Sequence, residues 1–433
     1  MTEFLRTISF QGGYNTTIVL LGATILGNAS GCVGAFIVLR RRALVADALA
    51  HATLPGICIA FLVLVAMGLP RSLPALLVGA ACTGAFGVVL VHLVTARTRL
   101  REDAAIGIVL SVFFGIGITL LGRIQSMPDA QQAGLKSFIY GQAATMLRED
   151  VIVIGVAAAF VLLCTGLLRR EFGLLAFDAE FASTQGWPTG LLDLLLLGLM
   201  TLVAVIGLYV VGIILIVALL IIPPVAARFW TSRSATMLLI SSAFGGASGF
   251  VGAALSSTRP DLPAGSVIVL TAGAFFLVSL LFAPTQGVVA SSIRFTRLRV
   301  RIAIEHVLRA LYEHVETIPE RDRDDAWIPM DDLRAERRWN PALASSLIRV
   351  LGARRLVMRG AGGVRLTPRG LALAADVTRR HRLWEEYLLH FAHEATHVHD
   401  AADAVEHYLS PESVAELERV LQREGRLPGG GSS

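Results

Sequence analysis

An aspartate and a histidine four positions apart stand out because the chain around them is apolar. They are Asp47 and His51, in the segment RRRALVADALAHATLPG. Positions i and i+4 of a helix share one face, so the spacing predicts that the two side chains lie one above the other. A carboxylate and an imidazole suit Mn2+, Fe2+ or Zn2+, so the pair predicts a metal site. The alternative is that Asp47 anchors a helix end near a membrane surface, with His51 as its hydrogen-bond partner.

A second group of acid–histidine pairs lies near the end of the chain. Three pairs have the i,i+4 spacing that puts both side chains on one helical face. They are His381 with Glu385, His399 with Asp403, and Asp403 with His407, beside which Glu406 lies. The donors are nitrogen and oxygen without any thiolate, which favours Mn2+, Fe2+ or Zn2+ without choosing among them. The alternative is a solvated helix face rich in histidine.

The elements that must position the first pair are membrane helices. Of the 433 residues, 54% are hydrophobic and 16% are charged, and the mean hydropathy is +0.65, which excludes an ordinary soluble protein. Nearly every window from Tyr14 to Ala283 is apolar, whereas charges of both signs dominate from Arg294 onward. We therefore expect a polytopic membrane domain over residues 1–293, followed by a soluble part of about 140 residues.

The apolar runs predict an all-α membrane domain of about eight or nine spanning helices, each long enough for about 30 Å of hydrocarbon. The runs are 14–39, 52–69, 73–96, 104–122, 150–168, 190–207, 209–227, 235–255 and 265–283. The break near residues 207–209 is the weakest of them. Arginine clusters follow alternate runs, which predicts an outside N-terminus and a cytoplasmic C-terminal domain. Asp47 then lies near the cytoplasmic surface, unless a break at Pro55-Gly56 carries it deeper.

Cysteine usage and the lack of a nucleotide-binding motif exclude two classes of chemistry. All four cysteines fall within apolar runs, and no CxxC spacing occurs. Disulfides and thiolate metal sites are therefore not expected. The sequence also contains no GxxxxGK[ST] motif, so we expect that this chain is not itself an ATP-hydrolysing enzyme. No organic cofactor is expected.

Two polar segments lie between the apolar runs. Residues 128–149 are too polar for a span and too apolar for a simple loop, which predicts a re-entrant segment or the lining of a water-filled path. Residues 169–190 are predicted to form a cytoplasmic loop with a short amphipathic helix near its centre. The residues of interest in this loop are Phe177, Asp178, Glu180, Phe181 and Gly186. Its exposed aromatic side chains must dock on a peripheral partner or on the membrane domain itself.

The membrane half resembles the zinc, manganese and iron ABC-importer permeases of the ABC-3 family. The resemblance covers residues 10–290 and rests on four segments in the right order. They are RRRALVADALAHATLPG, LKSFIYG, LLAFDAEFASTQGWP and LIVALLIIPPVAAR. It implies a permease of the bacterial inner membrane that works with a second permease copy or paralogue, ABC ATPase subunits and an extracytoplasmic metal-binding protein. It also implies that Asp47 and His51 lie on the metal path, and that the loop around Asp178 and Gly186 couples to the ATPase.

The soluble part has the pattern of a winged helix followed by further helices. Apolar residues at helical spacing over 297–316 predict an amphipathic helix. Asn340-Pro341 is a start signal for a second helix, and LVMRGAGGVRLT predicts a β-hairpin. Helical stretches are predicted over 368–388 and 397–422. We therefore expect a winged helix-turn-helix domain over 294–370, a helical metal-binding and dimerisation domain over 371–425, and a flexible tail over 426–433.

This soluble part resembles metal-dependent repressors of the diphtheria-toxin-repressor type over residues 300–422. The segments that carry the resemblance are LTPRGLALAADVTRRHRLWEEYLL and HVHDAADAVEHYLSPESV. It implies two regulatory sites for a divalent metal ion. One site would use His306, Asp403, Glu406 and His407, and the other His381, Glu385 and His399.

The function that follows is a divalent-metal permease whose cytoplasmic domain senses metal and regulates transport. The rival interpretation is a membrane-tethered, metal-dependent transcription regulator. It would contact DNA through Ser345, Ser346 and Arg349 of the predicted recognition helix. Nucleic acid is the less favoured partner, because positive and negative charges nearly cancel across the domain and the fusion ties it to the lipid membrane. A third interpretation, an ion-gradient-driven transporter, does not account for the coupling-like loop.

Overall fold

The computed structural model describes most of the chain as two compact units, Met1–Ser291 and Ser292–Ser433. The described residues are 7, 9, 13–69, 73–127, 146–259, 262–319, 323, 326–330, 341–360, 363–391 and 411–423. The predicted re-entrant segment 128–149 lies outside them, apart from its last four residues.

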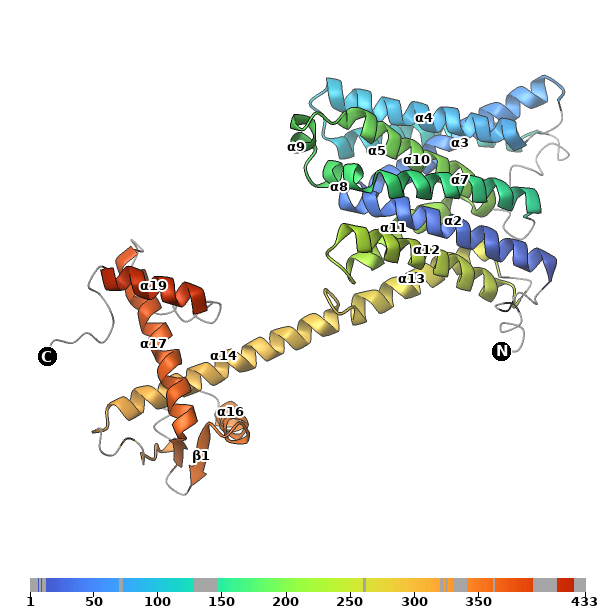
Figure 1. Cartoon of the computed structure of the whole chain (residues 1–433). Coiled ribbons are helices and arrows are strands. Elements are labelled where there is room, and N and C mark those ends of the chain that lie inside the picture. The colour runs from blue at the N-terminus through green and yellow to red at the C-terminus, as the bar shows by residue number, and fades with distance from the viewer. Residues whose placement is uncertain are drawn as a thin grey trace. The chain divides into compact units, whose positions relative to one another are not determined.

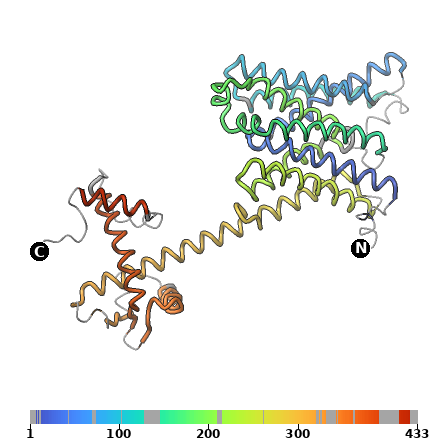
Figure 2. The backbone as a smooth tube through the Cα atoms, in the orientation of Figure 1, coloured from blue at the N-terminus to red at the C-terminus, as the bar shows by residue number. Residues whose placement is uncertain are grey.

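The first unit is a bundle of long apolar helices. Eight helices within the described residues are long and apolar enough to cross a membrane, which confirms the predicted all-α membrane part. They are α2 (Tyr14–Leu39), α3 (Ala43–Ala66), α4 (Leu73–Arg97), α5 (Glu102–Gln125), α7 (Arg148–Leu167), α10 (Thr189–Val211), α12 (Ser234–Ser256) and α13 (Ala264–Phe282). Figure 2 shows these helices running side by side along one direction.

The predicted break near residues 207–209 is wrong in position. Helix α10 continues to Val211, and Gly212 has a φ of 84°, a left-handed conformation that glycine adopts without strain. The following helix, α11 (Ile213–Arg228), has 16 residues, or about 24 Å at 1.5 Å per residue. It is therefore shorter than a full span and is not among the eight long helices.

Helix α2 lies near the middle of the first unit, with α7 on one side and α11 on the other (Figure 1). It packs tightly against α12 because glycines let the two backbones approach. A Cβ atom on Gly27 would lie 2.2 Å from the carbonyl oxygen of Gly245, and one on Gly31 would lie 2.2 Å from that of Ser241. Small residues at helix contacts serve the same purpose in membrane proteins generally.

Helix α3 packs against α4 and α5. It runs unbroken from Ala43 to Ala66 with Pro55 inside it, so the break considered at Pro55-Gly56 does not occur. Neighbouring helices can satisfy the backbone groups that such a proline frees. Asp47 and His51 therefore lie in the first three turns of one continuous helix, close after the arginines that follow α2.

The predicted short helix in the 169–190 loop is confirmed. The loop consists of α8 (Arg169–Phe177) and α9 (Ala179–Thr184). The Asp178 carboxylate accepts a hydrogen bond of 2.8 Å from the backbone N–H of Phe181 and so caps α9. After α9 the chain turns at Gly186 and enters α10 at Thr189.

The second unit combines helices with one β-hairpin. Its elements are α14 (Val288–Glu316), α16 (Pro341–Ala353), β1 (Val357–Gly360), β2 (Gly363–Leu366), α17 (Pro368–Phe391) and α19 (Pro411–Arg423). The predicted hairpin is confirmed as an antiparallel pair in which Val357 faces Leu366. The helix start at Pro341 is also as predicted, whereas α14 begins at Val288, within the first unit and ahead of the predicted start at residue 297.

Apolar side chains from α14, α16 and the hairpin form the core of the second unit. Val307, Leu308, Ile348 and Leu351 are fully buried there. A smaller cluster joins α17 to α19 through Leu383, Leu417 and Leu421. Arg382 of α17 donates a hydrogen bond of 3.0 Å to Glu316 at the end of α14, and this bond raises the pKa of Arg382 above its usual value.

Candidate functional site

Asp47 and His51 lie together on one face of α3, as the spacing predicts. The distance from His51 Nε2 to Asp47 Oδ1 is 3.3 Å, and the side chains are 22% and 39% exposed for His51 and Asp47. The His51 ring meets the Phe114 ring of α5 edge-on, with centroids 4.9 Å apart. His51 Nδ1 is buried and has no hydrogen-bond partner within the described residues. The pair therefore presents the Asp47 carboxylate and His51 Nε2, which lie close together, as two atoms that a metal ion could bind.

This pair is too small to hold a metal ion alone. Within the part of the chain that the structure describes, no three His, Cys, Asp or Glu side chains gather closely enough for a metal. Zn2+ in proteins takes four ligands, and Mn2+ takes about six. Among the described residues, Asp47 and His51 are therefore two ligands of an incomplete coordination sphere.

The other face of α3 is apolar and fixes the helix in the bundle. Ala46 and Ala50 are fully buried, and Val45 and Leu49 are nearly so. These residues face neighbouring helices, so α3 has an apolar side and a side that carries Asp47 and His51.

An ion-pair cluster that the sequence interpretation missed lies at the start of α3. Arg40 and Arg42 both donate to the carboxylate of Asp193 on α10, and the Arg42 distances are 2.9 and 3.2 Å. In the sequence, the arginines indicate only the orientation of the helices in the membrane. The available signal was Asp193 itself, because an acid inside an apolar run requires a partner.

The residues of the 169–190 loop divide into buried and exposed sets. Phe172 and Leu175 of α8 are buried against the bundle, and the Phe172 ring lies 5.3 Å from the Phe36 ring of α2. Phe177 and Phe181 are 67% and 49% exposed. Glu180 and Gly186 are also exposed. The loop therefore offers an aromatic surface on a rigid base.

The structure brings together only part of the predicted C-terminal metal sites. His381 Nε2 lies 3.6 Å from Glu385 Oε2 on α17, and His381 is nearly fully buried. His306 lies on α14, half-buried. The other predicted ligands, His399, Asp403, Glu406 and His407, lie outside the described residues. These metal sites therefore stay predictions.

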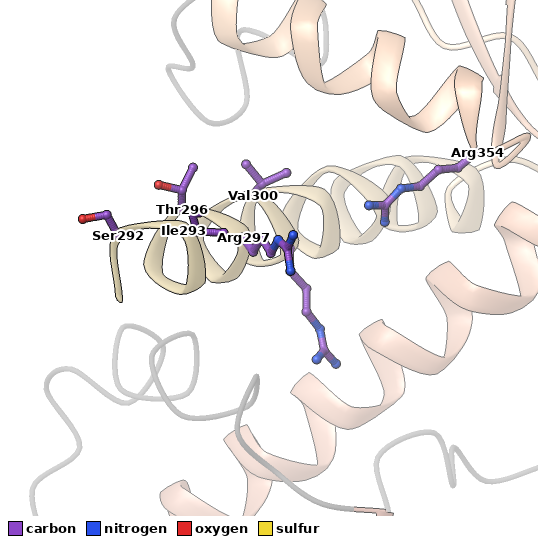
Figure 3. A pocket seen from close by; sticks show the side chains of 7 residues that line it. Ser292, Ile293, Thr296, Arg297, Val300 and Arg354 are labelled. Carbon is purple, nitrogen blue, oxygen red and sulfur yellow. The ribbon is translucent and has the colours of Figure 1, made fainter. Parts of the chain in front are cut away.

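The residues predicted to contact DNA lie on α16. Arg349 is exposed, and Ser345 and Ser346 are half-buried. A basic hollow of about 580 Å3 lies nearby in the same unit, between the first half of α14 and the end of α16. Arg297 and Arg354 extend from these two elements (Figure 3). Within the described residues, the hollow therefore combines apolar side chains with the positive charge of three arginines.

Comparison with known proteins finds a family match for the membrane part and a second match for a short C-terminal segment. Residues 14–283 match the ABC 3 transport family. Residues 367–432 match the metal binding and dimerisation domain of the iron-dependent repressors.

Some relatives match nearly the whole of this chain, and others match about two thirds of it. The manganese transport system membrane protein MntC of Bacillus subtilis is 39% identical over 96% of this chain and 93% of its own length. The zinc transport system membrane protein TroC of Treponema pallidum is 42% identical over 64% of this chain and 91% of its own. A solved structure described as PsaBC from Streptococcus pneumoniae in complex with Fab is 31% identical, with a TM-score of 0.56 over 66% of this chain and 97% of that one.

Proposed function

The chain belongs to the ABC 3 transport family, and from this premise we propose that it is the membrane permease subunit of an ATP-driven importer of manganese or zinc ions. The observation that carries the proposal is the Asp47–His51 pair, placed on one face of an apolar helix in a bundle of spanning helices. Relatives described as manganese and zinc transport proteins support these two ions as the substrate.

The chemistry of the pair suits a transported ion better than a permanently bound one. Asp47 and His51 supply one oxygen and one nitrogen ligand, and both side chains are partly exposed. Two protein ligands bind a divalent ion weakly enough for it to leave again. A second permease copy or paralogue, facing this side of α3, would complete the coordination during passage.

The exposed loop supports an ATPase subunit as the cytoplasmic partner. Helix α9 is short, capped by Asp178 and flanked by the exposed rings of Phe177 and Phe181. Such a helix fits a groove on a partner, where aromatic side chains provide most of the binding energy. We assign ATP hydrolysis to that separate chain and ion delivery to an extracytoplasmic metal-binding protein.

For the C-terminal part we propose a winged helix over 294–370 and a metal-binding domain over 371–425 that regulates transport. The match to the repressor metal-binding domain and the His381–Glu385 pair on α17 support metal sensing. The hairpin β1–β2 after α16 supports the winged helix. The rival role, DNA binding through Ser345, Ser346 and Arg349, would use the same fold.

The test of transport is ion uptake in cells that express the chain with its ATPase. We expect Asp47→Ala and His51→Ala each to lower uptake of 54Mn or 65Zn by about a hundredfold, because each removes one of two ligands. The matched control is Asp103→Ala, which makes the same change at an exposed acid in the first turn of α5. Normal uptake by Asp47→Ala would show that the pair is not on the metal path.

A further inference from the structure

The ion pairs of Asp193 form a cluster that the proposed metal path does not use. Asp193 lies near the start of α10, and both Arg40 and Arg42 donate to its carboxylate. The three side chains are largely buried, at 10%, 21% and 15% exposed for Arg40, Arg42 and Asp193. Partly buried charges are screened less by salt than surface pairs are. The cluster is therefore a stronger connection between helices than an ordinary surface salt bridge.

The cluster holds a strained turn at the base of α3. Between the two paired arginines, Arg41 has a φ of 58°, a conformation that residues other than glycine rarely adopt. Such a conformation persists where the surroundings determine it, and the flanking ion pairs to Asp193 provide this constraint. Arg42 is also the N-cap of α3. Asp193 is thus connected to the first turn of the helix that carries Asp47 and His51.

On its other side, Asp193 is connected to the loop proposed to dock on the ATPase. Helix α10 begins at Thr189, five residues after α9 ends at Thr184. Helix α8 of the same loop is joined to α2 by the contact of Phe172 with Phe36. A displacement of the loop therefore acts on α10 and on the end of α2 together, and Asp193 links these two elements to the base of α3.

We propose that Asp193 is a positioning residue for transport, which passes movement of the 169–190 loop through Arg40 and Arg42 to the Asp47–His51 pair. The inference rests on the proposed function. Asp193 does not bind the ion in this scheme. Its loss should separate ATP hydrolysis from ion movement, rather than weaken metal binding or stop hydrolysis.

The test uses the full chain with its ATPase in liposomes, and measures 54Mn uptake and phosphate release in the same preparation. We expect Asp193→Asn to lower the number of ions moved per ATP by about tenfold, within the usual range of coupling energies between sites. Asp193→Glu, which keeps the charge, should retain at least about half of the wild-type number of ions moved per ATP. Asp103→Asn is the matched control and should behave as the wild type. The melting temperature of each complex shows whether a change is only structural.

A second variant shows whether Asp193 acts through the arginines. Arg42→Gln leaves the Arg40–Asp193 pair in place, so it should lower the number of ions moved per ATP only in part. This variant also tests the inference if Asp193→Asn yields no folded protein. Combined with Asp193→Asn, it should cause no further loss. An unchanged ratio in these variants, or parallel losses of uptake, hydrolysis and melting temperature, would overturn the inference alone. A wild-type complex that moves neither manganese nor zinc would overturn the proposed function and this inference with it.

Discussion

The three consecutive arginines between α2 and α3 serve different physical roles although they are one residue type. Arg40 and Arg42 pair with Asp193 across the bundle, whereas Arg41 is exposed and forms the left-handed position of the turn. Their sequence pattern predicts orientation in the membrane. Their contacts add a second role, because two of them connect α10 to the helix that carries Asp47.

At the residue scale, the cap of α9 makes a testable contribution. Asp178→Ala removes the hydrogen bond to the Phe181 N–H and should destabilise α9 by about 1 kcal/mol. If α9 must be helical to dock, the affinity for the ATPase subunit should fall by about fivefold. Titration of the purified ATPase onto the permease measures this. Asp178→Asn, which caps equally well, is the control, and equal affinity of the Ala and Asn variants would contradict the proposed docking role.

At the scale of elements, the contact between α2 and α12 determines where the ends of α2 lie. Gly27, Gly31 and Gly245 have no side chain, so the two backbones meet directly. Dispersion contacts of this kind replace the hydrophobic effect inside a membrane. Because α2 leads into the arginine turn, its packing also positions the start of α3.

Because of this contact, a glycine-to-alanine substitution should destabilise the protein at Gly27 but not at Gly155. Gly27→Ala places a Cβ 2.2 Å from the backbone oxygen of Gly245, which no side-chain movement can relieve. We expect the melting temperature of the detergent-purified protein to fall by about 5 °C or more. Gly155→Ala in α7 meets no atom within 4 Å and should leave it unchanged or higher, because alanine favours helix. A small effect of Gly27→Ala would mean that the helices can move apart at little cost.

At the scale of the whole molecule, the chain joins a membrane unit to a second unit with its own core. The Val307–Ile348 cluster of the second unit consists entirely of residues beyond Ser291. The Treponema protein matches 64% of this chain over 91% of its own length, so it has no room for a second unit of this size. We therefore expect the membrane unit to transport metal ions without the second unit, and the second unit to regulate that transport.

Removal of the second unit tests this division. We expect a chain ending at Ser291 to take up 54Mn at near wild-type rates at low external metal. After cells are loaded with manganese, 54Mn uptake by the wild type should fall by about tenfold if regulation is of ordinary strength. Uptake by the truncated chain should stay at its earlier rate. Expression levels measured by immunoblot are the control. If the truncated chain also stops, the second unit does not regulate transport, and DNA binding by the second unit becomes the favoured role.

Features that arise within a few residues could be predicted from the amino-acid sequence. The shared face of Asp47 and His51, the α9 helix, the start of α16 and the β1–β2 hairpin all follow from local backbone geometry, which hydrogen bonds between near neighbours impose. Most of the apolar helices follow from composition alone.

Contacts between residues far apart in the sequence could not be predicted, because they depend on how whole helices pack. Arg40 and Asp193 are 153 positions apart, and the contact of Gly27 with Gly245 depends on the rotation of two whole helices. The position of the break at Gly212 likewise depends on α11 packing back against α10, where Ile216 lies over Gly207. Such contacts are set by packing among several helices at once, and hydropathy along one chain segment carries no information on the rotation of that segment against the others.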